Sequence, residues 1–334
     1  MAQEHKNVLV LGNGFDLYHK YKTGYKDFIE YIVENNPRNL RNNCFIDYFI
    51  KYNKYDKWID FEYEIENIVK CFIKIINHIE NNPIKDQHFT IELSLKETSI
   101  LSCFRSYILT IDKHCEIKDV YFNKDIGGLD KRKMIKDLRA ELDMVILELE
   151  TYLFKSVIPE KSTVISSQLK EINHFDKVIS FNYTHTYRIY NISDDKVDFI
   201  HGSLRNINSL NKKCDNNMVL GIQDINENLD FVYFKKYFQQ VQKHIPPMDY
   251  NMFQQNTVNG VPFLYHLYFF GHSLSKTDGD IIRNIINLAH KTTIYYYDQD
   301  DYEKKNINLI DVFGKENYIN RIRNNHSCEF IQLL

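Results

Sequence analysis

An apolar run that stops at two glycines is the feature that most restricts what this chain can fold into. Val8 to Leu11 is short, apolar and rich in branched residues, and Gly12-Asn13-Gly14 follows at once. Such a run is typical of a central parallel strand, and the glycines permit a sharp turn out of it. The sequence then predicts a helix that begins at about Asp16 or Tyr25 and ends at Asn36-Pro37.

The same alternation of strand and helix returns in the second half of the chain. We expect strands at 177–181, 197–203, 218–222, 264–270 and 293–298, with a helix at 280–290. This order predicts an α/β fold with a doubly wound parallel sheet, in which ligands bind beyond the carboxyl ends of the strands.

The middle of the chain has a different pattern. Segments 58–80 and 131–157 carry apolar residues at helical spacing, and 82–130 reads as irregular, with loop points at Pro83 and Gly127-Gly128. We therefore expect one domain over 1–334, with an α/β core formed by 1–37 and 174–334. A large helical insertion or cap would occupy 38–173.

Composition excludes several classes of protein. Hydrophobic residues make up 43% and charged residues 26%, and the net charge of −3 lacks the basic excess of most nucleic-acid-binding proteins. The six cysteines contain no CxxC pair, so neither a disulfide framework nor a zinc knuckle is expected. No apolar run approaches the roughly 20 residues of a membrane span, and a cytoplasmic protein with reduced cysteines is the preferred interpretation.

Four polar clusters each follow a predicted strand. They are Gly12-Asn13-Gly14-Phe15-Asp16, Asn182-Tyr183-Thr184-His185, His201-Gly202-Ser203 and Gly271-His272-Ser273. Each alone is explained by a turn or by a hydrogen-bonded histidine. In a parallel sheet, however, all four would lie along one edge, and together they favour a ligand site.

The first cluster departs from the known glycine-rich fingerprints. A third glycine at the dinucleotide spacing would stand at position 17, where the chain has Leu17. No GxxxxGK[ST] sequence is present either. An ordinary NAD-dependent dehydrogenase and a P-loop ATPase are therefore both disfavoured.

The later clusters suggest hydrolysis of an N-glycosidic bond. His201 can act as a general base or bond a ribose hydroxyl, and Asn182 can position a water, an amide or a ribose. A metal site is the alternative, and it would use His185, His201, His272 and Asp278. No pair of these residues has the HxxxH or HxH spacing of a preformed site.

These segments resemble a known family. The opening "VLVLGNGFDLYHKYKTGYKDF", "WIDFE" at 58–62, "SFNYTHT" at 180–186, "IHGS" at 200–203 and "FGHSLSKTDGD" at 270–280 are similar to the AbiH family of bacteriophage abortive-infection proteins. The resemblance covers residues 7 to about 298 and implies a role in antiviral defence.

The same motifs are also similar, in order and strand context, to sirtuin-like domains of bacterial defence proteins. That resemblance implies a Rossmann-like core that hydrolyses NAD, with Asn182 beside the nicotinamide ribose and His201 as the catalytic histidine. We expect Asp16 to act with them. The remaining cofactor-binding residues would be Gly12, Asn13, Gly14, Phe15, Thr184, Gly271, Ser273 and Asp278.

This chain departs from the sirtuin-like pattern in three ways. Thr184 stands where that pattern has an acid, and Asp16 stands where it has a small hydroxyl residue. We suggest that Asp16 supplies the missing carboxylate. The cysteine pairs of the deacetylase zinc module are absent, which argues against protein deacylation.

The "WIDFE" segment allows two interpretations. Trp58, Asp60 and Glu62 are either a core tryptophan with helix-capping acids or carboxylates that reach over a cleft.

The function expected from these residues is hydrolysis of NAD, or of a related nucleotide, to nicotinamide and ADP-ribose, with no resident metal or further cofactor. A phage-derived trigger and a homo-oligomer are expected as partners, and a membrane or nucleic acid is not. One alternative is a non-catalytic nucleotide-sensing or partner-binding module. The other is a metal-dependent nuclease built on Asp16, Glu62, Asp278 and Asp280.

Overall fold

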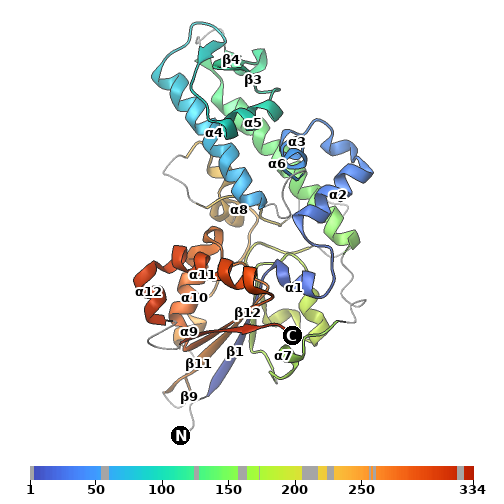
Figure 1. Ribbon diagram of the computed structural model, residues 1–334, viewed down its shortest axis with the longest axis vertical. Helices are drawn as coiled ribbons and strands as arrows, with labels where there is room; N and C mark the ends of the chain where they lie inside the picture. The colour runs from blue at the N-terminus through green and yellow to red at the C-terminus, as the bar shows by residue number, and fades with distance from the viewer. Residues whose placement is uncertain are drawn as a thin grey trace. The chain divides into compact units, whose positions relative to one another are not determined.

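The protein divides into two compact units in the computed structural model (Figure 1). The sheet unit consists of Met1–Gly24, Leu153–Met218 and Gln240–Leu334, and the helical unit consists of Tyr25–Tyr152 and Val219–Gln239. The structure describes residues 4–53, 60–123, 128–156, 164–172, 174–204, 217–223, 229–255, 257–258, 261–321 and 327–334.

A six-stranded parallel sheet forms the centre of the sheet unit. Its order is β13-β12-β11-β1-β7-β8, and every neighbouring pair is parallel. Counted along the chain and read from β8, this order is 3-2-1-4-5-6, as in doubly wound sheets. The predicted α/β fold with a parallel sheet is thus confirmed. The strands are β1 His5–Leu11, β7 Lys177–Ser180, β8 Val197–Phe199, β11 Leu264–Phe270, β12 Lys291–Tyr296 and β13 Cys328–Gln332.

Strand β1 shows why its sequence is apolar at four successive positions. Val8 and Val10 are fully buried in one hydrophobic core, and Leu9 and Leu11 are buried in a second core. Because successive side chains of a strand point to opposite faces, each face of the sheet has its own core. A strand buried on both sides has no position for a polar side chain.

Helices supply the rest of both cores. Helices α10 (Gly279–Leu288) and α11 (Gln299–Phe313) pack with Val8 and Val10, and α1 (Asn13–Tyr18) and α7 (Ser167–Lys170) pack with Leu9 and Leu11. The helix predicted at 280–290 is therefore confirmed as α10. The sheet unit also contains α9 (Met252–Gln255), α12 (Lys315–Ile319), β9 (Thr257–Val258) and β10 (Val261–Pro262).

The predicted strand at 218–222 is wrong. Among the described residues it forms only an isolated bridge between Ile222 and Lys235. The Gln239 side chain accepts from the Leu220 N–H and donates to the Leu220 carbonyl, so it replaces a neighbouring strand. The apolar residues are buried all the same, which is why their sequence resembles a strand. Conversely, the sequence analysis predicted no strand at β13, which is short and lies at the sheet edge.

Long amphipathic helices dominate the helical unit. The predicted helices at 58–80 and 131–157 are confirmed as α4 (Phe61–Asn81) and α6 (Lys131–Ser156), within the described residues. The helix predicted to begin at about Asp16 or Tyr25 is confirmed with the second start, as α2 in the helical unit, and the short helix α1 precedes it. The unit also contains α2 (Tyr25–Asn35), α3 (Cys44–Asn53) and α5 (Leu95–Cys103), and α8 (Lys236–Gln242) begins in it.

The prediction that 82–130 is irregular is wrong. This segment holds helix α5 and an antiparallel sheet in the order β2-β4-β3. Its strands have only three or four residues, too few for a clear alternating pattern. A capping box of Ser94 and Glu97 starts α5 and could have been found in the sequence. The strands of this sheet are β2 His88–Thr90, β3 Ile108–Ile111 and β4 His114–Ile117, and β5 (Phe122–Asn123) and β6 (Gly128–Leu129) form a separate antiparallel pair.

The helices and the cysteines of the described part of the chain bear on two further expectations, which concern membrane spans and disulfide bonds. None of its helices has the length and hydropathy needed to cross a lipid bilayer. Cys44, Cys71, Cys103, Cys115 and Cys328 are all free, as the absence of CxxC pairs predicted. Cys214 lies outside the described residues.

Candidate functional site

The four polar clusters follow four strands that are neighbours in the sheet. The order β11-β1-β7-β8 brings the chain segments after Phe270, Leu11, Ser180 and Phe199 to one edge. All these strands are parallel, so their carboxyl ends share that edge. The strand order reverses between β1 and β11, which is the position where doubly wound sheets bind ligands.

The glycines after β1 and β11 let two turns pack backbone against backbone. Gly12 N–H donates to the Phe270 carbonyl at 3.1 Å, and Gly14 N–H donates to the Gly271 carbonyl at 2.8 Å. Phe15 N–H donates to the Gly12 carbonyl at 2.8 Å. These three N–H groups are bonded within the protein and are not directed at a ligand. Glycine is therefore required here because the two turns pack too closely for a larger side chain.

Replacing Gly271 by alanine is expected to destabilise the sheet unit by about 3 kcal/mol or more. Gly271 has a φ of 70°, and a Cβ there would overlap the backbone of Gly14 and Phe15. Gly314→Ala is the control, because Gly314 has a φ of 76° with no atom near its Cβ position. It should lose about 1–3 kcal/mol, because its φ of 76° and ψ of 155° lie in a region restricted essentially to glycine, and no steric overlap adds to that cost. Urea denaturation of both variants measures the difference, and equal losses would contradict a tight contact between the turns.

Asp16 is a buried carboxyl group with one oxygen unused. Thr184 Oγ1 donates to its Oδ2 at 2.6 Å, whereas Oδ1 is buried and has no hydrogen-bond partner in the described part of the chain. Burial raises the pKa of Asp16 to about 6, and hydrogen bonds from Thr184, Thr186 and Asn182 offset only part of that effect. The structure therefore brings Asp16, Asn182 and Thr184 together, as the sequence predicted them to lie on one edge.

Asn182 is tied to the neighbouring strand end. Its Nδ2 donates to the Gly12 carbonyl at 3.0 Å, and its backbone N–H donates to Ser180 Oγ at 3.2 Å. The side chain is 7% exposed. One Nδ2 hydrogen thus fixes β7 to the turn after β1, and the role of Asn182 toward a ligand stays a prediction.

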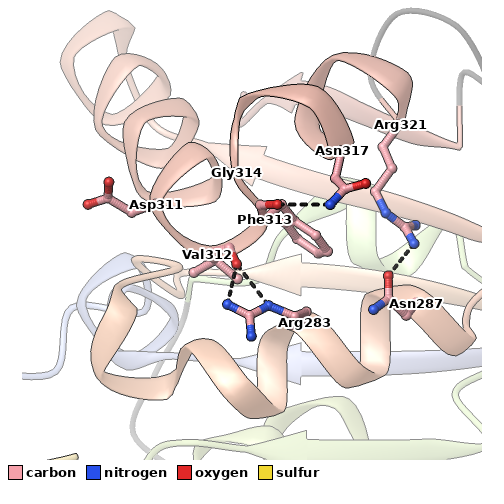
Figure 2. Close-up of a pocket in the computed structure, with 8 residues that line it drawn as sticks. All are labelled: Arg283, Asn287, Asp311, Val312, Phe313, Gly314, Asn317 and Arg321. Carbon is pink, nitrogen blue, oxygen red and sulfur yellow. Dashed lines mark hydrogen bonds between the residues drawn. The ribbon is translucent and has the colours of Figure 1, made fainter. Parts of the chain in front are cut away.

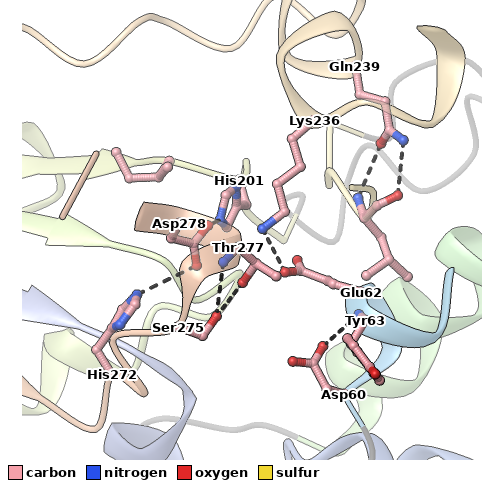
Figure 3. Close-up of polar contacts among 12 residues, drawn as sticks. Asp60, Glu62, Tyr63, His201, Lys236, Gln239, His272, Ser275, Thr277 and Asp278 are labelled. Carbon is pink, nitrogen blue, oxygen red and sulfur yellow. Dashed lines mark hydrogen bonds and ion pairs between the residues drawn. The ribbon is translucent and has the colours of Figure 1, made fainter. Parts of the chain in front are cut away.

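His201 and Asp278 form a buried hydrogen-bonded pair (Figure 3). His201 Nε2 lies 2.8 Å from Asp278 Oδ1, and the exposed fractions of the two side chains are 6% and 12%. His201 Nδ1 is buried with no hydrogen-bond partner. The tautomer that fits these contacts has the hydrogen on Nε2, facing the carboxylate, and a lone pair on Nδ1.

The turn that carries His201 is held from two sides. Gln240 Nε2 donates to the Ile200 carbonyl at 2.9 Å. Gly202 has a φ of 75°, and a Cβ there would overlap the Asn217 carbonyl. The position of His201 is therefore set by its backbone as well as by Asp278. Asp278 was predicted as a cofactor-binding residue, and its pairing with His201, 77 residues away, was not predicted.

Ser273 lies apart from the buried groups. It is exposed, and its carbonyl accepts a hydrogen bond from Asn308 of α11 at 2.8 Å. Its predicted contact with a ribose or phosphate stays a prediction, as do the ligand contacts of Asn13.

The acids of the "WIDFE" segment lie in the helical unit. Asp60 caps α4, since its Oδ1 accepts from the Tyr63 N–H at 3.1 Å. Glu62 forms a 2.6 Å ion pair with Lys236 of α8, and both side chains are largely buried (Figure 3). The sequence analysis did not anticipate Lys236. Trp58 lies outside the described residues.

The metal alternatives find no support in the described ranges. Within them, no three His, Cys, Asp or Glu residues are placed to hold a metal ion. The His185 ring instead packs beside Tyr187 and Phe199. Burial lowers the pKa of His185 to about 4, so the ring is neutral at physiological pH.

A surface cavity of about 460 Å³ lies elsewhere in the sheet unit (Figure 2). No predicted site residue lines it. Arg283 donates to the Val312 carbonyl at the end of α11, and Arg321 donates to the Ile286 carbonyl near the end of α10. Both guanidinium groups thus stabilise the C-termini of helices. The side chains that line the cavity therefore hold helices together and do not form a catalytic site. The cavity is lined by Arg283, Asn287, Asp311, Val312, Phe313, Gly314, Asn317 and Arg321.

Comparison with known proteins gives one match. The model of a family described as "Bacteriophage abortive infection AbiH" matches residues 8–298. No curated protein and no solved structure matches the chain.

Proposed function

The chain belongs to the AbiH family of bacteriophage abortive-infection proteins, and from this premise we propose that it defends the cell by hydrolysing NAD. The reaction would convert NAD and water to nicotinamide, ADP-ribose and a proton. The observation that carries the proposal is the buried His201–Asp278 pair, with an unpartnered ring nitrogen, at the carboxyl edge of a doubly wound sheet.

The first support is the position of the polar groups. The strand order reverses between β1 and β11, and sheets with this order bind dinucleotides at that crevice. Asp16 and Asn182 follow β1 and β7, which are adjacent strands, and His201 follows β8, the next one. The similarity of the motifs to sirtuin-like domains makes NAD the preferred nucleotide.

His201 would act as the general base. Its Nδ1 would take a proton from a water molecule while the water oxygen bonds to C1′ of the nicotinamide ribose. The bond between C1′ and the pyridinium nitrogen would break at the same time, with its electron pair leaving on neutral nicotinamide. Asp278, bonded to Nε2, would stabilise the imidazolium that forms.

Asp16 would supply negative charge to the transition state. Cleavage of a glycosidic bond develops positive charge on the ribose ring, by analogy with glycosidases. An ionised Asp16 with a buried and unpartnered Oδ1 is suited to stabilise such a charge. Its raised pKa means that part of the population is protonated just below neutral pH.

The strand-end turns would contact the rest of the nucleotide. Asn13, Thr184 and Ser273 are the proposed contacts for the ribose and diphosphate, whereas Phe15 is fully buried in a hydrophobic core and Gly271 packs against Gly14. Gly12 and Gly14 give no independent support for phosphate binding, because their own packing against β11 already requires glycine.

Incubation of the purified full-length protein with NAD tests the proposal. Nicotinamide release is measured by chromatography and NAD binding by calorimetry, with and without lysate from phage-infected cells. NADP and ADP-ribose are the matched ligands, which report whether the nicotinamide end or the adenine end is required. Failure to bind NAD and failure to release nicotinamide under every condition would contradict the proposal.

A non-catalytic nucleotide sensor is the second candidate. In the hydrolysis mechanism, the Asn182 amide and the turn after β1 contact the nucleotide. In the structure, these groups already form hydrogen bonds within the protein, which favours a sensor. NAD binding without nicotinamide release, also in the presence of infected-cell lysate, would support this candidate over hydrolysis.

A further inference from the structure

The Asp278 carboxylate lies between two imidazole rings (Figure 3). Its Oδ1 is 2.8 Å from His201 Nε2, and its Oδ2 is 3.7 Å from His272 Nε2. All three side chains are largely buried, and His272 is only 3% exposed. The reaction proposed above gives His272 no role.

The orientation of the His272 ring is determined by its own turn. The Leu274 N–H donates to His272 Nδ1 at 2.9 Å, so Nδ1 carries no hydrogen. The hydrogen of the neutral ring is then on Nε2, the atom that faces Asp278. Leu274 itself has a φ of 60°, which is rare for a bulky residue, and its fully buried side chain holds it there.

A phenylalanine ring joins the two histidines. The Phe181 ring packs edge-on against His272 at 4.3 Å and against His201 at 5.6 Å between ring centroids. Phe181 itself is 8% exposed, so this side of both rings is apolar. Asp278 is therefore the polar group that the two rings share.

We propose that His272 is a positioning residue for His201. Its Nε2–H attracts Asp278 Oδ2 and directs Oδ1 toward His201 Nε2. Asp278 then holds the hydrogen of His201 on Nε2 and leaves the lone pair on Nδ1. The kinetic consequence rests on the proposed NAD hydrolysis, whereas the effect on the His201 tautomer does not.

Two substitutions at His272 separate this role from a purely structural one. In His272→Asn, the side-chain oxygen lies near the place of Nδ1 and can still accept from Leu274, but nothing replaces Nε2. In His272→Gln, the amide reaches the place of Nε2 and can donate to Asp278. His266→Asn is the control, since His266 of β11 bonds Thr293 of β12 and Tyr268 of its own strand instead.

The first readout is the tautomer of His201, measured by nitrogen-15 NMR of the protein labelled at histidine. We expect a single Nε2–H tautomer in the wild type, in His266→Asn and in His272→Gln, and a mixture in His272→Asn. The second readout is nicotinamide release, for which His272→Asn should lower kcat about 10- to 100-fold with little change in KM. His272→Gln should restore most of that loss.

An unchanged His201 tautomer in His272→Asn would overturn the inference. It would also be overturned if His272→Asn and His272→Gln lost kcat and melting temperature to the same extent, since His272 would then be structural only. If the wild type releases no nicotinamide, the proposed reaction fails, and the tautomer measurement still decides the role of His272.

Discussion

Replacing His201 by alanine is expected to lower the rate of nicotinamide release by about 10²- to 10⁴-fold, the usual contribution of a general base. The buried Nδ1 of His201 has no hydrogen-bond partner among the residues that the structure describes, and Nε2 is held by Asp278 at 2.8 Å. Alanine removes the imidazole lone pair that is proposed to take a proton from water. NAD binding should change little, so the loss is expected in kcat rather than in KM.

His290→Ala provides the control for the His201 variant. His290 is an exposed histidine directly before β12, at the amino end of the strand, and it takes no part in the strand-end clusters. It should retain wild-type activity. Full nicotinamide release by a folded His201→Ala protein would show that the site is wrong even if the reaction is right. Thermal denaturation establishes that the variant is folded.

Replacing Asp16 by asparagine is expected to have opposite effects on stability and on activity. The pKa of Asp16 is about 6 in the folded protein, against 3.8 for an ordinary aspartate. The folded state therefore binds its proton more tightly, and ionisation of Asp16 destabilises the fold as the pH rises from about 4 to 6. At 1.36 kcal/mol per pKa unit, the cost above pH 6 is about 3 kcal/mol.

Asparagine cannot ionise, so Asp16→Asn removes this dependence on pH. The free energy of unfolding of the variant, relative to wild type, should rise by about 2–3 kcal/mol between pH 4 and pH 7 and then stay level. Nicotinamide release should fall roughly 10²- to 10³-fold, since the negative charge is lost. Urea denaturation at a series of pH values measures the first effect.

Asp194→Asn is the matched control, because the pKa of Asp194 is shifted in the opposite direction to that of Asp16. A hydrogen bond from Arg188 lowers the pKa of Asp194 to about 2, and the pair is exposed at the surface. This carboxylate stabilises the fold above pH 4, and that stability is lost as the pH falls toward 2. The control should therefore be slightly less stable than wild type at pH 7 and equal to it at low pH. A pH-independent difference for Asp16→Asn would contradict the buried, titrating carboxyl group.

The local patterns of the chain were sufficient for several of the longer elements, although helix α11 was not predicted. Helices α4, α6 and α10 follow from apolar residues at helical spacing, and β1 follows from four apolar residues in succession. The short strands β2, β3, β4 and β13 were missed, because they carry too few positions for a periodic pattern. The segment 218–222 was misread, since burial alone produces an apolar run and Gln239 satisfies its backbone without a strand.

The common edge of the four polar clusters could also be predicted from the sequence. It follows from the direction of the strands, and alternating strands and helices imply a parallel sheet. By itself, then, the sequence determined the α/β class and the chain segments that meet at the carboxyl edge. These properties depend on residues that are close to one another along the chain, so the sequence alone shows them.

Which atoms face one another was decided only by the tertiary structure. Asp16 meets Thr184 across 168 residues, and His201 meets Asp278 across 77. The raised pKa of Asp16 results from burial, which no local pattern reports. Tautomers and pKa values are set by desolvation and by partners brought together from distant strands. For that reason the sequence indicated where a site lies, and the fold determined which of its groups can accept a proton.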